Sequence, residues 1–395
     1  MNIHEYQAKE LFKQYDIPVP EGYPAFDLKD VERIMEEHFP EGKVVLKAQV
    51  QTGGRGKAGG ILLAENKEEA LAAAKTLFGK TLYTKQSGPE GKLIRKLYIE
   101  KQTAHDNEYY LSLLIDNKQG KCVFIASRQG GMEIEEVAEK DPEAILKMAV
   151  ELTEGVDESQ ARSLAERLGF EKETADDFVT LLKNIFRLFV SRDCSLIEIN
   201  PLSICDGRLI CLDAKVGLDS GALFRQPDNV LLRDIDEENP LEAEASDEGM
   251  SYVSLGGDIG CMCNGAGLGM STMDTINHIG LKPANFLDLG GSVDDVRANK
   301  AFKLIIKEKG IKGIIVNIFG GIARTNLIAK GITEAIMETG YPDPVVCRIE
   351  GNGDVEAHEY ISNCQGNIYQ ATSCIDACEK MKELLKEDHH VDLGQ

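Results

Sequence analysis

The sequence predicts an α/β protein of two parts, the second of which is a doubly wound parallel sheet. From residue 252 onward, short apolar runs alternate with helical patterns, and Gly-Gly pairs follow two of these runs at 290–291 and 320–321. This alternation is typical of parallel strands joined by crossover helices. The first half mixes strand and helix patterns, and an acidic stretch at 233–248 separates the halves. A length of 395 residues fits two or three domains.

Composition excludes several classes of protein. A net charge of -22 argues against binding to nucleic acid or to an anionic membrane surface. The sequence contains no apolar run of the roughly 20 residues that a membrane span needs, and its first residues lack a signal core. The ten cysteines are scattered and mostly lie in apolar runs, which favours buried reduced thiols. We therefore expect a cytoplasmic protein, with a mitochondrial matrix location after leader removal left open.

In chain order, the first half begins with an amphipathic helix over 4–15 that ends before Pro18. A strand over 44–48 contains Lys47, which is unusual in a buried strand unless the lysine meets an anion. Residues 61–64 form the next strand, and Asn66 caps a helix that runs to residue 78. The remaining predictions are strands over 93–101, 109–116 and 122–127, and helices over 138–153, 160–169 and 174–191.

The loop at 51–60 has five glycines together with Arg55 and Lys57. Bare backbone amides and cationic side chains suit phosphate binding. A solvated hairpin tip is the alternative. The loop contains G-x-G-x-x-G, but a strand follows it where a dinucleotide fold would open a helix. The acidic residues Glu100 and Glu108 at nearby strand ends are candidates to hold ribose hydroxyls or a base amine.

Residues 195–215 read as a hairpin whose turn is Asp206-Gly207. With that turn, facing residues have numbers that sum to 413, so Asn200 faces Asp213 and Glu198 faces Lys215. These polar side chains share one face of the hairpin, because side chains alternate between faces. Mg²⁺ carrying phosphates would suit these oxygen donors. The alternative is an exposed hairpin with a cross-strand ion pair.

In the second half, the residues that follow the strands are candidates for ligand binding. Ligands of doubly wound sheets bind outside the carboxyl ends of the strands, where helix N-termini attract anions. The motif Asn264-Gly265-Ala266-Gly267 and the two Gly-Gly pairs fall at these ends. The predicted strands are 285–289, 313–319, 344–349 and 368–371, and the predicted helices are 293–308, 324–339, 354–362 and 374–386.

These motifs resemble those of succinate–CoA ligase beta subunits, nearly from end to end. The matching stretches are MNIHEYQAKELF, GGRGKAGG, LIEINPL with LICLDAK, ALFRQPD, IGCMCNGAGLGMSTMD, PANFLDLGG and VNIFGGI. The resemblance implies an N-terminal ATP-grasp domain over 1–235 and a flavodoxin-like CoA-ligase domain over 251–388. The acidic linker would span 236–250 and a tail 389–395.

The resemblance also implies roles for individual residues, motif by motif. Asn200 and Asp213 would bind Mg²⁺, the pair that the hairpin register places face to face. Glu198 would act in catalysis by orienting an incoming histidine. The residues implied in nucleotide binding are Lys47, Gly54, Arg55, Gly56, Glu100, Thr103 and Glu108. Those implied on the substrate and phosphate side are Asn264, Gly321, Ile322 and Ala323.

The activity that the family implies is half of an acid–thiol ligase. ATP, a carboxylate and CoA give an acyl-CoA, ADP and phosphate through a phosphohistidine. An alpha subunit would supply that histidine and most of the CoA site, in one or two alpha–beta pairs. None of the seven histidines lies in a glycine-rich loop, which fits this division. Pro20 resembles the ADP-forming members of the family, which implies ATP and ADP rather than GTP and GDP.

The sequence departs from the family pattern at three places: Gly256-Gly257, Ser292 and Thr325-Asn326. All three lie on the carboxylate and phosphate side of the implied site, so they affect the choice of acid substrate more than the choice of nucleotide. A malate–CoA ligase or another dicarboxylate–CoA ligase beta subunit is therefore the alternative. A regulatory subunit that has lost turnover is disfavoured by the intact Lys47, Asn200 and Asp213. A dinucleotide oxidoreductase is disfavoured by the strand after Gly60.

Overall fold

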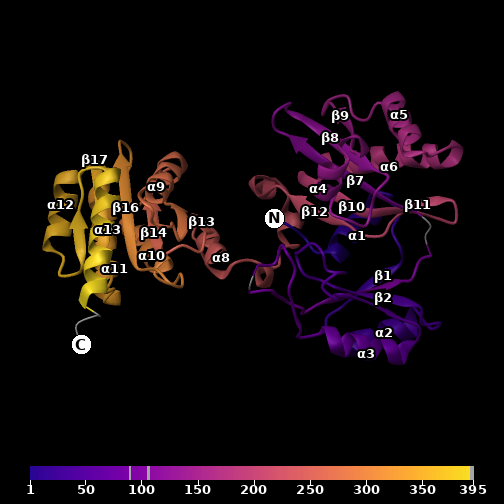
Figure 1. Ribbon diagram of the computed structural model, residues 1–395, viewed down its shortest axis with the longest axis horizontal. Helices are drawn as coiled ribbons and strands as arrows, with labels where there is room; N and C mark the ends of the chain where they lie inside the picture. Colours follow the sequence, from indigo (N-terminus) through magenta and orange to yellow (C-terminus); the bar gives the residue numbers. More distant parts are fainter. Residues whose placement is uncertain (89, 105–106, 392–395) are drawn as a thin grey trace. The chain divides into compact units, whose positions relative to one another are not determined.

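The computed structural model describes residues 1–88, 90–104 and 107–391, the last five by their backbone alone. The chain divides into two compact units, Met1–Glu237 and Glu238–Gln395 (Figure 1). Each unit has its own hydrophobic cores, which is the property expected of a domain.

Unit 1 contains a small sheet of order β1-β6-β2-β3, in which all neighbours pair antiparallel. Helices α2 and α3 pack on it and bury Val31, Ile34 and Leu77 against Leu46 and Ile99. Asn66 caps α3 by accepting a hydrogen bond from the Glu69 amide, as its sequence predicts. Residues 51–60 connect β2 and β3 at one end of this sheet.

The larger sheet of unit 1 has the order β11-β10-β7-β8-β9, with β12 also paired to β10. Helices α1, α5 and α6 bury their apolar faces against it, with Phe12, Leu164 and Phe178 in one core. The elements of unit 1 are α1 (Glu5–Gln14), β1 (Gly22–Ala25), α2 (Leu28–Glu37), β2 (Val44–Ala48), β3 (Ile61–Ala64), α3 (Lys67–Leu77), β4 (Thr81–Leu82), β5 (Lys92–Leu93), β6 (Leu97–Lys101), β7 (Glu108–Asp116), β8 (Lys121–Ser127), α4 (Ile134–Lys140), η1 (Pro142–Ala144), β9 (Leu146–Val150), α5 (Glu158–Leu168), α6 (Lys172–Ser191), β10 (Cys194–Cys205), β11 (Arg208–Cys211), β12 (Lys215–Leu218), η2 (Ser220–Arg225), α7 (Pro227–Val230) and η3 (Ile235–Glu237).

Unit 2 is a sheet of order β13-β15-β14-β16-β17-β18, parallel except for the edge strand β13. The doubly wound parallel sheet that the sequence predicts is therefore confirmed. Its elements are α8 (Pro240–Asp247), β13 (Ser251–Ser254), β14 (Ile259–Cys263), α9 (Ala266–Ile279), β15 (Asn285–Asp288), α10 (Asp295–Ile305), β16 (Gly313–Gly320), α11 (Thr325–Thr339), β17 (Val345–Gly351), α12 (Asp354–Asn363), β18 (Ile368–Gln370) and α13 (Cys374–Val391).

The predicted helix over 138–153 is wrong. Helix α4 ends at Lys140, and residues 146–150 form strand β9 at the edge of the larger sheet. Leu146, Met148 and Val150 are buried while the residues between them are exposed. This alternation has the two-residue period of a strand. The sequence prediction missed it because it treated 138–153 as one helical segment.

The predicted linker and the predicted tail also differ from expectation. Within the acidic stretch 236–250, predicted as a linker, α8 packs on β13 and α10 and buries Ala243 and Ala245. Its glutamates pair with lysines of α10 and the residues after it, including Glu244 with Lys307. Helix α13 continues to Val391, into the predicted tail, and residues 392–395 lie outside the described part. Among the described residues, none of the helices combines the length and apolarity needed to span a bilayer.

Candidate functional site

A cavity of about 790 Å³ opens in unit 1, and the four-stranded and the six-stranded sheets of the unit contribute to its walls. It brings together residues that the sequence predicts as a site but that lie far apart along the chain. All ten predicted residues of the first half line it: Lys47, Gly54, Arg55, Gly56, Glu100, Thr103, Glu108, Glu198, Asn200 and Asp213. Their convergence on one cavity is what the prediction of a single site requires.

The hairpin has the predicted register. Leu202 faces Cys211 and Cys205 faces Arg208 across β10 and β11, and Glu198 faces Lys215 across β10 and β12. Each of these pairs sums to 413. Asp206 and Gly207 have φ values of 50° and 77°, as a two-residue hairpin turn with left-handed central residues requires. Asn200 and Asp213 occupy matching positions in the interval between the two paired segments.

Hydrogen bonds fix the side chains of Asn200 and Asp213. Asn200 Oδ1 accepts from the Gly131 amide at 2.7 Å, and its Nδ2 donates to the Met132 carbonyl at 2.9 Å. Asp213 accepts from the Ala214 amide at 2.8 Å and from Arg55 at 3.0 and 3.1 Å. The cross-strand ion pair of the alternative reading is also present, with Lys215 Nζ 3.8 Å from Glu198 Oε2.

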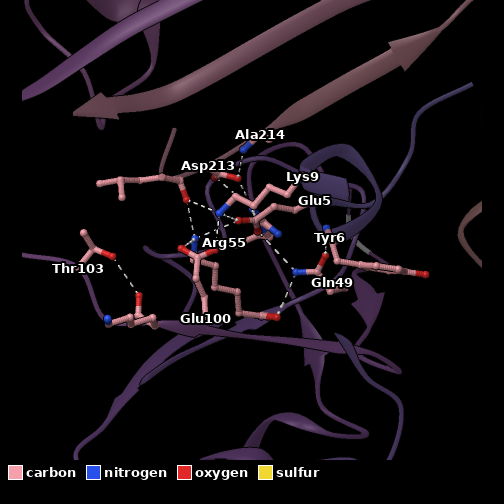
Figure 2. Close-up of polar contacts among 12 residues, drawn as sticks. Glu5, Tyr6, Lys9, Gln49, Arg55, Glu100, Thr103, Asp213 and Ala214 are labelled. Atoms are coloured by element: carbon pink, nitrogen blue, oxygen red, sulfur yellow. Dashed lines mark hydrogen bonds and ion pairs between the residues drawn. The ribbon is translucent and has the colours of Figure 1, made fainter. Parts of the chain in front are cut away.

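Six ionisable side chains form a largely buried charge cluster at the cavity: Glu5, Lys9, Lys47, Arg55 and Glu100, which are buried, and the partly exposed Asp213. Figure 2 labels all of them except Lys47. Lys47 Nζ lies 2.9 Å from Glu5 Oε1 and 3.1 Å from Glu100 Oε1. Lys9 Nζ contacts Glu100 and lies 3.0 Å from Glu5 Oε1. Arg55 Nη2 lies 2.8 Å from Glu5 and 3.0 Å from Asp213. Three cations thus balance three carboxylates, as burial of charge requires.

The two glutamates at the centre of the cluster respond differently to it. Burial raises the pKa of a carboxyl group, but Lys47, Lys9 and Arg55 together hold the pKa of Glu5 well below its ordinary value. Burial raises the pKa of Glu100, and Lys47 and Lys9 do not offset that effect, since Glu5 repels the charged form. Glu5 is therefore the anion that anchors all three cations.

Glu5 and Lys9 are site residues that sequence reasoning missed. They stand four apart on α1, a spacing that usually marks an exposed helical ion pair. Lys9 is instead fully buried, on the same face as Phe12, and it also donates to the Leu212 carbonyl at 2.7 Å. A lysine on the apolar face of this helix was the signal that could have revealed the cluster.

Arg55 does not behave as part of a solvated hairpin tip. Its side chain turns inward from the 51–60 loop, is buried, and donates to the Ala48 carbonyl at 3.0 Å as well as to the carboxylates. Gly54, with φ of 73° and open space around it, gives the turn that permits this. Lys57 lies on the exposed part of the loop.

Glu198 lies beside the cavity in a partly buried position. Burial raises the pKa of its carboxyl group despite the Lys215 ammonium nearby, and Asp213 and Glu135 add to the rise. Thr103 Oγ1 donates to the Lys101 carbonyl at 3.2 Å, and Glu108 is exposed at the start of β7. The raised pKa of Glu198 makes its carboxyl group a better proton acceptor than that of an ordinary glutamate.

In unit 2, Asn264 ties the carboxyl ends of β14 and β16 together. Its Nδ2 donates to the Phe319 carbonyl and its Oδ1 accepts from the Phe319 amide, both at 3.0 Å. Gly321, Ile322 and Ala323 follow β16 as a turn, and α11 begins only at Thr325. Ile322 is exposed and Ala323 is buried. The helix predicted over 324–339 therefore begins one residue later than expected, at Thr325.

Comparison with known proteins assigns both units. Family models for the ATP-grasp domain and for CoA-ligase match residues 2–204 and 262–382. The chain is 47% identical over 388 residues to the succinate–CoA ligase [ADP-forming] subunit beta of Exiguobacterium sibiricum, covering 98% of this chain and 100% of that one. It is 47% identical over 390 residues to the protein of the same name from Staphylococcus aureus, with the same coverage.

The chain belongs to the family of succinate–CoA ligase beta subunits.

The predicted order, an ATP-grasp domain followed by a CoA-ligase domain, is confirmed by this membership. A solved ATP citrate lyase from Methanothrix soehngenii, determined with citrate and coenzyme A, has the same fold. Its TM-score is 0.74 at 19% identity, and the match covers 97% of this chain and 99% of that one.

The ATP-grasp domain of a succinate–CoA ligase beta subunit uses ATP or ADP with Mg²⁺ in general. The donor set of this chain fits such an ion, because an amide oxygen and a carboxylate are hard oxygen ligands. Both line the cavity, and the Asp213 side chain keeps 34% of its surface exposed. A carboxylate has about four lone-pair directions, of which the Asp213 contacts above use three.

Proposed function

We propose that this chain is the beta subunit of an ADP-forming succinate–CoA ligase. It binds Mg-nucleotide in the cavity of unit 1. Together with an alpha subunit that carries the phosphorylated histidine and CoA, it interconverts succinate, CoA and ATP with succinyl-CoA, ADP and phosphate. The observation that carries the proposal is 47% identity to proteins of that name over 98% of this chain.

Each residue of the cavity has a physical task in this proposal. Lys47 and Arg55 offset phosphate charge, since both are cations that line the cavity wall. Gly54 and Gly56 let backbone amides approach the phosphates. Thr103, Glu100 and Glu108 hold the nucleoside through hydroxyl and amine contacts.

Asn200 and Asp213 would hold Mg²⁺, which when bound neutralises the phosphate charge of in-line transfer. Asn200 accepts a hydrogen bond from the Gly131 amide and donates one to the Met132 carbonyl, which fixes the orientation of its side-chain amide. Its oxygen could therefore bind the ion without reorganisation. Arg55 stays paired with Glu5 at 2.8 Å even if Asp213 turns toward the ion. The cluster would then hold three cations against two carboxylates, and the nucleotide phosphates would offset that excess of positive charge.

Glu198 would orient the incoming histidine of the partner. Its raised pKa suits a group that accepts a hydrogen bond from an imidazole and can share its proton. In unit 2, Asn264 and residues 321–323 would face the phosphorylated loop and the carboxylate. The amides that precede α11 support this, because helix starts favour anions.

Succinate is favoured over malate because the named relatives are succinate ligases. The identity of the carboxylic acid substrate is the part of the proposal that most needs an assay, because the chain departs from the family pattern at Gly256-Gly257, Ser292 and Thr325-Asn326. The cytoplasmic location expected from the sequence stays a prediction.

The test is reconstitution. The purified chain is mixed with its co-expressed alpha subunit, and thioester formation is measured for a panel of dicarboxylates with ATP and with GTP. The proposal expects thioester only when both subunits are present, with succinate and ATP preferred. Preference for malate would overturn the assigned acid, and turnover by the chain alone would overturn the assignment of half an enzyme.

A further inference from the structure

Four thiols converge inside unit 2, where neither the cavity nor the substrate residues use them. Cys261 and Cys263 point the same way from β14, since they stand two apart on a strand. Cys374 and Cys378 stand one turn apart on α13. Together with the hydroxyl of Thr272 on α9, they form what we term the thiol cluster.

The thiol cluster is centred on Thr272. Cys263 Sγ lies 3.5 Å and Cys374 Sγ 3.9 Å from Thr272 Oγ1. Cys261 Sγ lies 3.7 Å from Cys263 Sγ. All four cysteines are free thiols, and three of them, Cys261, Cys263 and Cys378, are completely buried. Cys374 is only partly buried, so it is the thiol of the cluster that solvent reaches.

Cys374 is also the thiol with the surroundings of a thiolate. It is the first residue of α13, where the helix dipole favours negative charge. A side-chain hydrogen bond with Cys378, together with Thr275, Thr272 and the charge of Arg348, lowers the pKa of Cys374 to about 6. The same hydrogen bond and burial raise the pKa of Cys378, which therefore keeps its proton.

We propose that Cys374 and Cys378 are a peroxide-reactive thiol pair, the site of a reversible oxidation of this protein. The partly exposed thiolate of Cys374 attacks hydrogen peroxide. A sulfur–oxygen bond forms, the oxygen–oxygen bond breaks, and the hydroxide that leaves takes a proton to become water. Cys378 then attacks the sulfenic acid at Cys374, and a second water leaves with the proton of Cys378. Two thiols and one peroxide thus give one disulfide and two waters.

Helix geometry makes this disulfide strained. Residues four apart on a helix have Cβ atoms about 5–6 Å apart, whereas a disulfide needs about 3.5–4.5 Å. Closing that gap distorts the first turn of α13, where the Ala377 amide donates to the Ser373 carbonyl at 2.9 Å and the Asp376 amide to Ser373 Oγ at 3.1 Å. Strained disulfides are readily reduced, which is the property of a reversible modification rather than of a structural bridge.

Cys378 is the resolving thiol rather than Cys263. Cys263 belongs to β14, a central strand paired on both sides, and cannot shift without disturbing the sheet. Cys378 shares a helix end with Cys374, and a helix end can unwind. The inference does not depend on the proposed function, because every group it uses lies within unit 2.

The test uses the full chain, reduced and then treated with a small excess of hydrogen peroxide. Intact mass should fall by two hydrogens. Cleavage before Asp376 separates Cys374 from Cys378 in the sequence, so a bond between them should hold the two fragments together. The amides of residues 374–378 should exchange with deuterium faster after oxidation. An unchanged mass, or a disulfide that maps to Cys263 or Cys364, would overturn the proposal.

Variants separate the two roles. Cys378→Ser should stop at a sulfenic acid on Cys374 that dimedone traps. Cys374→Ser should give neither product and consume peroxide at least about tenfold more slowly. Cys364→Ser is the matched control, since Cys364 is also partly buried and lies outside the cluster, and it should behave as wild type. Dimedone labelling at another cysteine of the wild-type chain would contradict the proposal even if a variant failed to fold.

Discussion

Replacing Lys9 by methionine tests whether the buried charge cluster is as tightly balanced as its geometry indicates. Lys9 has no exposed surface and contacts Glu5, Glu100 and the Leu212 carbonyl. Methionine has a similar length but no charge, so the cluster would hold two cations and three carboxylates. Removing one partner of a buried pair typically costs about 3–5 kcal/mol, because a charge is left uncompensated. We expect the unfolding free energy of unit 1 to fall by an amount in this range.

The measurement is native-state hydrogen exchange of amides in α1 and β6, with amides of unit 2 as an internal reference. Lys13→Met is the matched control on the same helix. Lys13 pairs with Glu10 at 3.6 Å, but both are well exposed, so the loss should stay within about 1 kcal/mol.

The double variant Lys9→Met with Glu5→Gln restores charge balance, two cations against two carboxylates. It should therefore recover a measurable part of the stability lost in the single variant. A single variant no less stable than Lys13→Met would refute the reasoning, and so would a double variant whose losses simply add.

The other predictions concern pH, assembly and the turn. Because the pKa of Glu5 lies well below its ordinary value of 4.5, the stability it contributes is full above that pH and is lost as pH falls below it. Glu5→Gln should therefore flatten the acid side of the unfolding free energy of unit 1 plotted against pH, and an unchanged slope would count against the cluster. The purified chain should show no thioester formation without its partner, in an assay where the mixed subunits turn over. Gly207→Val places a β-branched residue at φ of 77°, which should destabilise the hairpin by about 1–2 kcal/mol in urea titrations, whereas Gly207→Asn should cost less.

The sequence predicted the hairpin register because two independent constraints agree there. The Asp206-Gly207 turn specifies which residues pair, and the apolar alternation specifies which face is buried. The predicted nucleotide residues also share one cavity, although ranges far apart had to be brought together by the fold. The prediction that these residues form one site came from their resemblance to family motifs, because local sequence patterns do not show which distant segments meet.

Other features could not be read locally. The spacing of Glu5 and Lys9 looks the same for an exposed pair and for a buried one, and only the packing of α1 against both sheets distinguishes them. Strand β9 at residues 146–150 follows α4 and η1 with one residue between successive elements. The sequence prediction therefore merged the end of α4, η1 and β9 into a single helix. In 236–250, the acidic composition concealed Ala243 and Ala245, which are buried when helix α8 packs on β13 and α10.

The most direct test of the account is the affinity of the chain for ADP with Mg²⁺ and with a chelator, in wild type and in Asp213→Asn. If Asp213 binds the ion, the variant should lose at least about tenfold in affinity with Mg²⁺, equal to about 1.4 kcal/mol. Without the ion it should bind as well as wild type or better, because one negative charge near the phosphates is gone. Asp206→Asn, a matched change at the hairpin turn, should leave both affinities unaltered. An Asp213→Asn chain that keeps the full advantage of Mg²⁺ would contradict the magnesium site at this hairpin.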